Sequence, residues 1–426
     1  MIPEKFALAA LLAYNIRKEV SDMQLIERQE YLAWLERWQS KQIIKVVSGV
    51  RRCGKSTLFD LFRQHLLRQG VRPEQILTVN FEAIEFELLR DYHRLYTYIS
   101  ERLQAGSMNY IFLDEVQHCR EYQKAVDSLF IKDNCDLYLT GSNAYFMSGE
   151  LATVLSGRYV ELKMLPLSFK EFIQGLQGDY AQLSRGQQFN LYLEYGALPF
   201  ITRYNSFGSD AKNYLQDVYN TIILNDIVQR LGVADVTALG NIAKFMVDNI
   251  GNRVSVNKIA NTLKSAGKGV DSKTVDKYLQ GYTDALFLYK APRYNIKGKQ
   301  LLTTLGKYYV VDLGLRNLLV RNKASDIGHV LENVVYLELL RRGYEVYVGD
   351  LENSEVDFIA WKDGRAEYYQ VSATALEEST LRRELAPFKN IPDNYPKYLL
   401  TLDEVFGEMD YAGVQKKNLL SWLLLS

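Results

Sequence analysis

Eight consecutive residues, from Gly49 to Ser56, have the types and spacing needed to hold a chain of phosphates. They fit the pattern G-x-x-x-x-G-K-[ST] at every fixed position. The glycines let backbone N–H groups curl around phosphate oxygens, the Lys55 ammonium can reach the β- and γ-phosphates, and the Ser56 hydroxyl can ligate magnesium. The pattern predicts a site for ATP and Mg²⁺. Its nucleotide-contacting residues would be Gly49, Val50, Arg51, Arg52, Cys53, Gly54, Lys55, Ser56 and Thr57.

An acid pair follows the apolar run from Tyr110 to Leu113. At the end of a strand, two acids alone are only a solvated turn, but a phosphate loop upstream gives them a role. Asp114 would hold the magnesium ion, usually through water, and Glu115 would act as general base on the attacking water. An aspartate alone would fit nucleotide binding equally well. The second acid therefore favours hydrolysis.

Two more residues are candidates for catalysis. Asn143 follows an expected strand at 137–141, where a polar side chain can contact the γ-phosphate or the attacking water. The alternative is that it caps the next helix. Arg158 is a candidate arginine finger, acting on its own nucleotide or on that of a neighbouring subunit. The alternative is a surface arginine that pairs locally.

The cysteines point to a reducing compartment, the cytoplasm. Three of them, with no regular spacing, form no disulfide framework. The four histidines show no ligand spacing with the cysteines, so we expect no zinc site. Cys53 lies near a helix start and two arginines, which can lower the pKa of a thiol. Its oxidation could then block nucleotide binding; otherwise it is a small residue tolerated in the loop.

Short β-branched runs alternate with helical patterns around these residues. Such alternation predicts a parallel sheet with right-handed crossovers. Residues 40–165 are therefore expected to form a doubly wound α/β core. The phosphate loop would join its first strand to a helix whose positive end faces the phosphates. The strands are expected at 43–48, 76–81, 110–113, 137–140 and 159–164.

The rest of the chain divides by its patterns. Residues 1–39 form an N-terminal helical segment, and 166–239 a helical lid or connector. In 240–321, three helices precede a β-hairpin, which is the winged-helix arrangement. Residues 322–426 then form a small α/β domain.

The 426-residue chain carries 51 basic and 51 acidic residues, but the charges are not evenly spread. Residues 252–299 contain ten Lys or Arg and only three Asp. A basic winged helix is the electrostatic signature of duplex DNA binding. The helix at 272–282 would enter the groove with Lys273 and Lys277, and Lys297 and Lys299 would lie on the wing. The alternative is a protein-interaction module.

The chain resembles prokaryotic AAA+ superfamily ATPases whose core is followed by an uncharacterised C-terminal region. The resemblance extends from about Arg28 to Ser372 and implies an intracellular ATPase. Relatives of this core often form rings, so a homo-oligomer is expected by analogy. The matching stretches are 48–56, 114–117, 139–143, 156–161, 166–169, 195–199 and 307–316.

The last domain resembles the restriction-endonuclease-like fold. Glu332 and Asp357 occupy the first two places of its metal site. The third place reads Gln370-Val371-Ser372, which lacks both the acid that magnesium favours and the lysine. We therefore expect a nuclease-shaped domain with little or no cleavage. The alternative is that Glu332 and Asp357 are ordinary surface acids.

The sequence predicts no membrane partner. The apolar run from Phe6 to Tyr14 is far shorter than the roughly 20 residues that a span needs. It is either a packing helix or precedes a true start at Met23. The patterns together favour an ATPase. The rivals are a switch that binds ATP and turns over rarely, a DNA-processing nuclease, and a scaffold with a vestigial loop.

Overall fold

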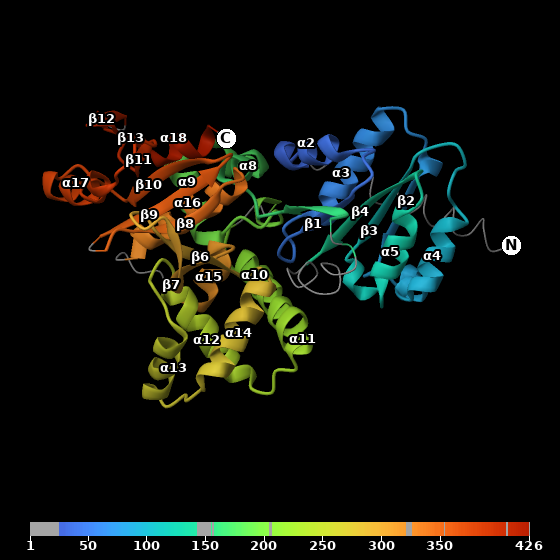
Figure 1. Ribbon diagram of the computed structural model, residues 1–426, viewed down its shortest axis with the longest axis horizontal. Helices are drawn as coiled ribbons and strands as arrows, with labels where there is room; N and C mark the ends of the chain where they lie inside the picture. Colours follow the sequence, from blue (N-terminus) through green and yellow to red (C-terminus); the bar gives the residue numbers. More distant parts are fainter. Residues whose placement is uncertain are drawn as a thin grey trace.

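The chain forms two lobes, each built on its own β-sheet (Figure 1). The computed structural model describes residues 25–142, 155, 157–203, 207–320, 326–352, 354–405 and 408–425. Asn143 lies outside these residues. Among the described helices, none has the length and apolar character to cross a bilayer.

The first lobe contains a five-stranded parallel sheet in the order β2-β3-β4-β1-β5. This confirms the expected α/β core with a parallel sheet. Because neighbouring residues of a strand face opposite sides, Val47 packs on one face of the sheet and Val46 on the other. The strands are β1 Ile44–Ser48, β2 Ile76–Asn80, β3 Asn109–Asp114, β4 Cys135–Gly141 and β5 Tyr159–Lys163.

Helices cover both faces of this sheet (Figure 1). Phe59 and Phe62 of α3 pack on Phe112 and Tyr138, while Leu95 of α4 lies on the opposite face. The elements of this lobe are α2 Gln29–Trp38, α3 Lys55–Arg68, η2 Pro73–Gln75, η3 Ile84–Arg90, α4 Tyr92–Ser100, η4 Val116–His118 and α5 Tyr122–Phe130. Both faces are therefore buried, as a parallel sheet requires.

A series of helices connects the lobes. The longest helix extends without a break from Ser209 to Leu231, and its segment η7 has π-helical rather than α-helical geometry. We call this helix, made of α10, η7 and α11, the connector helix. The elements are α8 Phe169–Gly175, η5 Gly178–Gln182, α9 Arg185–Tyr195, η6 Ile201–Arg203, α10 Ser209–Thr221, η7 Ile222–Val228 and α11 Gln229–Leu231.

Three helices and a hairpin follow in the order expected of a winged helix. Side chains of Asp235, Ser255 and Asp271 accept hydrogen bonds from the first backbone N–H groups of these helices, which fixes where each begins. The elements are α12 Val236–Asp248, α13 Val256–Ser265, α14 Ser272–Asp284, β6 Leu288–Asn295, β7 Gln300–Val310 and α15 Leu313–Leu319.

The hairpin does not stand apart as a wing. Its strand β6 pairs in parallel with β8, at Arg293–Val348 and Asn295–Asp350, so the expected boundary at 321/322 falls within one sheet. This mixed, eight-stranded sheet has the order β12-β13-β11-β10-β9-β8-β6-β7. Its other strands are β8 Glu345–Asp350, β9 Glu355–Lys362, β10 Arg365–Ser372, β11 Lys397–Thr401, β12 Met409–Tyr411 and β13 Val414–Asn418; the helices are α16 Ile327–Arg341, α17 Glu378–Leu385, η9 Pro387–Asn390 and α18 Leu419–Leu424.

Two of the resemblance motifs interlock where α9 meets α15. Buried Asp312 accepts hydrogen bonds from the backbone N–H of Ala197 at 2.6 Å and of Leu315 at 3.1 Å. A Cβ on Gly314 would lie 2.1 Å from the carbonyl oxygen of Tyr195, so only glycine allows this approach. These motifs therefore join the helices between the lobes to the C-terminal lobe.

Candidate nucleotide-binding site

The phosphate loop lies at the edge of the sheet where the parallel strands end. Gly49 follows β1, and a Cβ there would lie 2.5 Å from the carbonyl oxygen of Met164. Gly54 has φ +106°, a conformation that favours glycine, and α3 begins at the next residue. The loop is thus bent so that its backbone amides and the positive end of α3 meet at one place.

The Lys55 side chain is buried within this loop. Its ammonium donates to the carbonyl oxygen of Gly49 at 3.0 Å and lies 3.1 Å from Oε1 of Glu115. Burial disfavours the charged form of Glu115, but the Lys55 ammonium, the Gln117 amide and the Arg51 guanidinium together outweigh burial and lower the pKa of the carboxyl to about 2. The two residues expected to serve phosphate and water are therefore paired with each other.

Asp114 lies at the end of β3 with two hydroxyl partners. Thr140 donates to Asp114 Oδ1 at 2.5 Å, and the Ser56 hydroxyl also hydrogen-bonds to this carboxylate. Burial raises the pKa of Asp114. The described residues contain no group of three or more His, Cys, Asp and Glu side chains suited to enclose a metal. Magnesium commonly takes one or two carboxylates together with substrate phosphates, so the Ser56 and Asp114 oxygens fit it.

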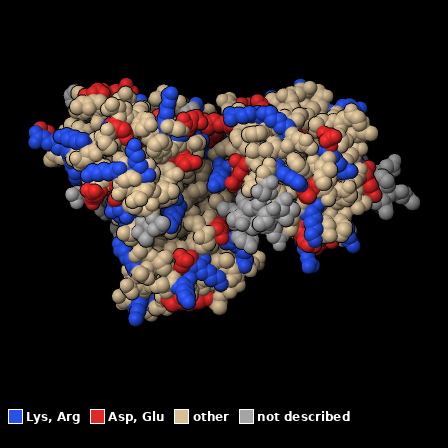
Figure 2. All heavy atoms as spheres, in the orientation of Figure 1, with Lys and Arg blue, Asp and Glu red and all other residues tan. Residues whose placement is uncertain are grey.

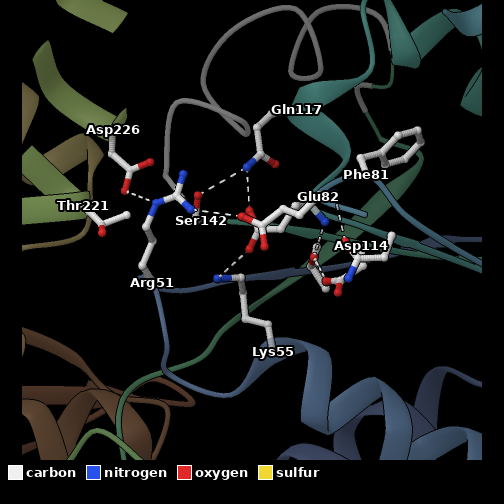
Figure 3. A network of polar contacts seen from close by, with 12 residues as sticks. Arg51, Lys55, Phe81, Glu82, Asp114, Gln117, Ser142, Thr221 and Asp226 are labelled. Carbon is white, nitrogen blue, oxygen red and sulfur yellow. Dashed lines mark hydrogen bonds and ion pairs between the residues drawn. The ribbon is translucent and has the colours of Figure 1, made fainter. Parts of the chain in front are cut away.

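Glu115 is fixed by the neighbouring strand as well as by Lys55. Its backbone N–H donates to Thr140 Oγ1 at 2.8 Å, and its φ of +54° turns the chain sharply after β3. Gln117 Nε2 donates to Glu115 Oε2 at 2.5 Å and to Ser142 Oγ at 3.2 Å (Figure 3). Gln117 belongs to the resemblance motif that contains the acids, but its residue type and position alone did not predict this role.

Arg51, expected from the sequence to contact the nucleotide, also makes a long-range contact that the sequence did not indicate. Its Nε donates to Asp226 of the connector helix at 2.8 Å, and one terminal nitrogen donates to Glu82 at 3.2 Å (Figure 3). Its positive charge is close enough to help lower the pKa of Glu115. No local pattern links Arg51 to Asp226, because 175 positions separate them.

Arg158 is not at this edge of the sheet. It directly precedes β5, and its carbonyl oxygen accepts from the N–H of Ile44 at the start of β1. Its guanidinium pairs with Asp127. Because β1 and β5 are parallel, Arg158 lies at the amino edge, opposite the phosphate loop. It therefore cannot reach this chain's own nucleotide, and its action on a neighbouring subunit stays a prediction.

For Cys53, the structure favours the small tolerated loop residue over the reactive thiol. The thiol is fully buried in the loop, and this burial raises its pKa. The nearby charges of Lys55 and Arg28 lower it less. A buried thiol with a raised pKa has little thiolate and is not a ready target of oxidation.

A hollow lies beside the loop, between the first turn of α3 and the chain segments around Ile26 and Pro199. Apolar side chains make up most of its lining, as a site for the flat face of a base requires. The lining residues are Leu25, Ile26, Arg28, Gly54, Thr57, Leu58, Met164, Leu167, Gly175, Gln177, Pro199 and Thr202.

The basic segment at 252–299 is partly neutralised by acids that follow it in the chain. Arg253 pairs with Glu355 at 2.6 Å, and Lys297 pairs with Glu352 at 3.3 Å. Arg293 pairs with Asp350. Figure 2 shows one face of the part that contains α12, α13 and α14, at the bottom of the view. On this face, acidic side chains lie among basic ones. The local excess of positive charge is thus smaller than the sequence count indicates.

The acids of the last domain form a buried cluster with a lysine. Glu332 on α16 and Asp357 on β9 are both buried, so they are not ordinary surface acids. The Lys307 ammonium lies 3.1 Å from Glu332, 2.7 Å from Glu355 and 3.9 Å from Asp357. Lys307 comes from β7, which lies in the region 240–321 that was expected to be a separate winged-helix domain. Gln370 Nε2 donates to Glu384 at 3.0 Å, and its Oε1 accepts from the backbone N–H of Asp357 at 3.3 Å.

Two family models match the chain. Residues 41–173 match the AAA domain, and residues 186–326 match a domain of unknown function (DUF8612). With the phosphate loop and acid pair in place, the first lobe is an AAA-domain P-loop fold, and an AAA domain implies nucleotide binding.

The chain belongs to the family of an uncharacterized protein of Haemophilus influenzae. The two are 39% identical over 401 residues, which span 94% of this chain and 99% of that protein. An uncharacterized protein of Methanocaldococcus jannaschii is 27% identical over 361 residues, or 81% of this chain and 78% of that one. A Walker-type ATPase of Pyrococcus abyssi, 15% identical, has a TM-score of 0.48 and covers 69% of this chain and 96% of its own.

Proposed function

We propose that the protein binds magnesium-ATP and hydrolyses the bond to its γ-phosphate. One observation carries the proposal: Lys55, Ser56, Asp114 and Glu115 converge at the edge of the sheet where the phosphate loop curls. A lysine, two metal-binding oxygens and a carboxylate base are the groups that phosphoryl transfer to water requires. The apolar hollow beside Thr57 is the place we assign to the adenine base.

In the proposed reaction a water oxygen attacks the γ-phosphorus. The bond to the β–γ bridging oxygen breaks, its electron pair leaves with ADP, and Glu115 accepts the water's proton. Magnesium, held through Ser56 and Asp114, would neutralise phosphate charge. Phosphate oxygens compete with Glu115 for the Lys55 ammonium. If Lys55 turns to them, burial raises the pKa of Glu115 and makes it a stronger base.

The test is phosphate release compared with nucleotide binding. We expect Lys55→Ala to lose ATP binding in calorimetry. Glu115→Gln should keep binding, while its turnover falls by about 100-fold or more. Unchanged turnover in Glu115→Gln would favour the switch that binds ATP and rarely hydrolyses it. Absence of ATP binding by the unaltered protein would favour the scaffold.

A role for Arg158 requires a second subunit, and a mixing experiment tests it. An Arg158→Ala subunit still has Glu115 as the base, and a Glu115→Gln subunit still has Arg158. If Arg158 acts on a neighbour, each variant alone is inactive and the mixture regains part of the activity. Full activity of Arg158→Ala alone would make Arg158 a surface arginine, paired with Asp127. Light scattering gives the subunit count.

We infer that the last domain has little or no nuclease activity. The Lys307 ammonium pairs with Glu332, Glu355 and Asp357. Neither Gln370 nor Ser372 adds an acid or a lysine to this cluster. This arrangement does not present free carboxylates to magnesium. Supercoiled DNA incubated with magnesium should stay intact. Nicking that Asp357→Ala abolishes would favour the nuclease instead.

A further inference from the structure

We propose that the guanidinium of Arg51 stabilises the γ-phosphate during hydrolysis, and that Asp226 of the connector helix positions it. The inference rests on the proposed ATPase function and adds two residues to it, Arg51 and Asp226. Arg51 would act directly on phosphate charge. Asp226 would act through Arg51, and would make catalysis depend on where the connector helix lies.

The position of Arg51 is the first part of the argument. It is the third residue of the phosphate loop, between Gly49 and Gly54. Its side chain is only 13% exposed, and its charge acts on the same Glu115 carboxylate as that of Lys55. Figure 3 shows the Arg51 guanidinium beside Asp226 and above the Lys55 side chain. A cation here faces the place where water and the γ-phosphate would meet.

The orientation of Arg51 is the second part. Asp226 holds Nε and Glu82 holds Nη1, so two carboxylates fix the plane of the guanidinium. Nη2 has no hydrogen-bond partner among the described residues. A planar group fixed from two sides, with donors left over, is preorganised to bind phosphate oxygens. It needs no rearrangement when charge develops on them.

Asp226 is an unusual residue to find in this place. Its side chain is 4% exposed, and a carboxylate buried without a partner would be costly. Burial raises its pKa, while the Arg51 cation lowers it. Asp226 belongs to η7, a π-helical interruption of the connector helix, and such interruptions are frequent at functional sites. The helix thus departs from regular geometry at the segment that carries this carboxylate.

The same helix also contacts α14. A Cβ on Gly281 of α14 would lie 2.7 Å from Leu231 and 3.1 Å from Ile227, so the two helices are in close contact. Arg230 pairs with Asp284 at 3.1 Å. A shift of α14 would therefore move the connector helix and, with it, the carboxylate that orients Arg51.

The first test separates binding from turnover in Arg51→Ala. We expect the Kd for ADP to stay within about threefold, because the contact is to the γ-phosphate, while kcat falls by about 100-fold or more. Arg51→Lys should not restore kcat, because an ammonium lacks the planar fork. The control is Arg68→Ala, which removes an exposed arginine from the far end of α3 and should leave both values unchanged. A kcat within threefold of the unaltered protein, or equal loss of ADP binding and turnover, would overturn the proposal.

The second test concerns Asp226. Asp226→Asn should lower kcat about tenfold with little change in the Kd for ADP, and should lower it no further in the Arg51→Ala background. Additive losses in the double variant would show that Asp226 does not act through Arg51. Melting temperatures show whether each variant is folded. If the unaltered protein and Lys55→Ala show equal phosphate release, the ATPase proposal itself fails. Normal release in all Arg51 and Asp226 variants defeats only this inference.

Discussion

The Lys55 ammonium and the Glu115 carboxylate lie 3.1 Å apart, as a buried ion pair at the proposed phosphate-binding site. Lys55 is expected to bind phosphate, and Glu115 is expected to activate water. The two side chains stay paired with each other until a ligand competes for the Lys55 ammonium. Such a pair stabilises the fold as well as preparing the site. The stability of the protein without nucleotide should therefore report on it.

The first prediction is a loss of stability in acid. The pKa of Glu115 is lowered from 4.5 to about 2, so its contribution is present above about pH 4.5 and is lost as the pH falls towards 2. Between pH 6 and pH 3 the difference amounts to about 2 kcal/mol. Urea unfolding gives the free energy of unfolding of the unaltered protein and of Glu115→Gln at each pH. The gap between these two free energies should shrink by this amount from pH 6 to pH 3. A pH-independent difference would contradict it.

The second prediction concerns the interlocked motifs. Gly314→Ala forces a methyl group to within 2.1 Å of the Tyr195 carbonyl oxygen, and should destabilise the protein by about 3 kcal/mol or more. Gly328→Ala is the matched control, because a Cβ there meets no atom within 4 Å and the residue lies in α16. It should be neutral or slightly stabilising. Equal melting temperatures for both variants would rule out the proposed close approach.

The third prediction concerns DNA. Lys273 and Lys277 lie exposed on α14, where Lys277 also donates to the carbonyl oxygen of Leu231 at 2.9 Å. Lys297 is paired with the Glu352 carboxylate. If 252–299 binds duplex DNA, the Lys273→Ala/Lys277→Ala variant should lose affinity and reduce the slope of log K against log salt by about 2. Lys297→Ala should change both less. Fluorescence anisotropy at several salt concentrations measures these values. Binding that is insensitive to salt would favour a protein partner.

The core and its main site could be predicted because their signals are local. A β-branched run, a glycine-rich loop and a lysine that starts a helix lie within fifteen residues of Ile44, and so do not depend on distant packing. The position of Arg158 was also within reach. Arg158 precedes β5, so it lies at the edge of the sheet where the parallel strands begin. The phosphate loop follows β1 and therefore lies at the opposite edge, where the strands end.

The contacts between distant segments could not be predicted. Arg51 meets Asp226 only because the connector helix folds back over the loop, and neither segment shows a pattern that names the other. The hairpin at 288–310 shows the alternation of any hairpin, but the pattern does not say which strand it will join. Its pairing with β8 brings Lys307 to the acids of a domain that seemed separate.

The last prediction concerns that lysine. Lys307→Met removes the cation shared by Glu332, Glu355 and Asp357, and should destabilise the protein by about 3–5 kcal/mol at neutral pH. Part of the loss should be recovered near pH 5, because carboxyls without a cation have raised pKa values and are neutralised by protons. Asp357→Asn should cost far less, since burial and Glu332 already raise the pKa of Asp357 well above its ordinary value. Urea unfolding at pH 5 and pH 7 measures both variants. If Lys307→Met and Asp357→Asn are equally stable at neutral pH, Lys307 is not what holds this cluster together.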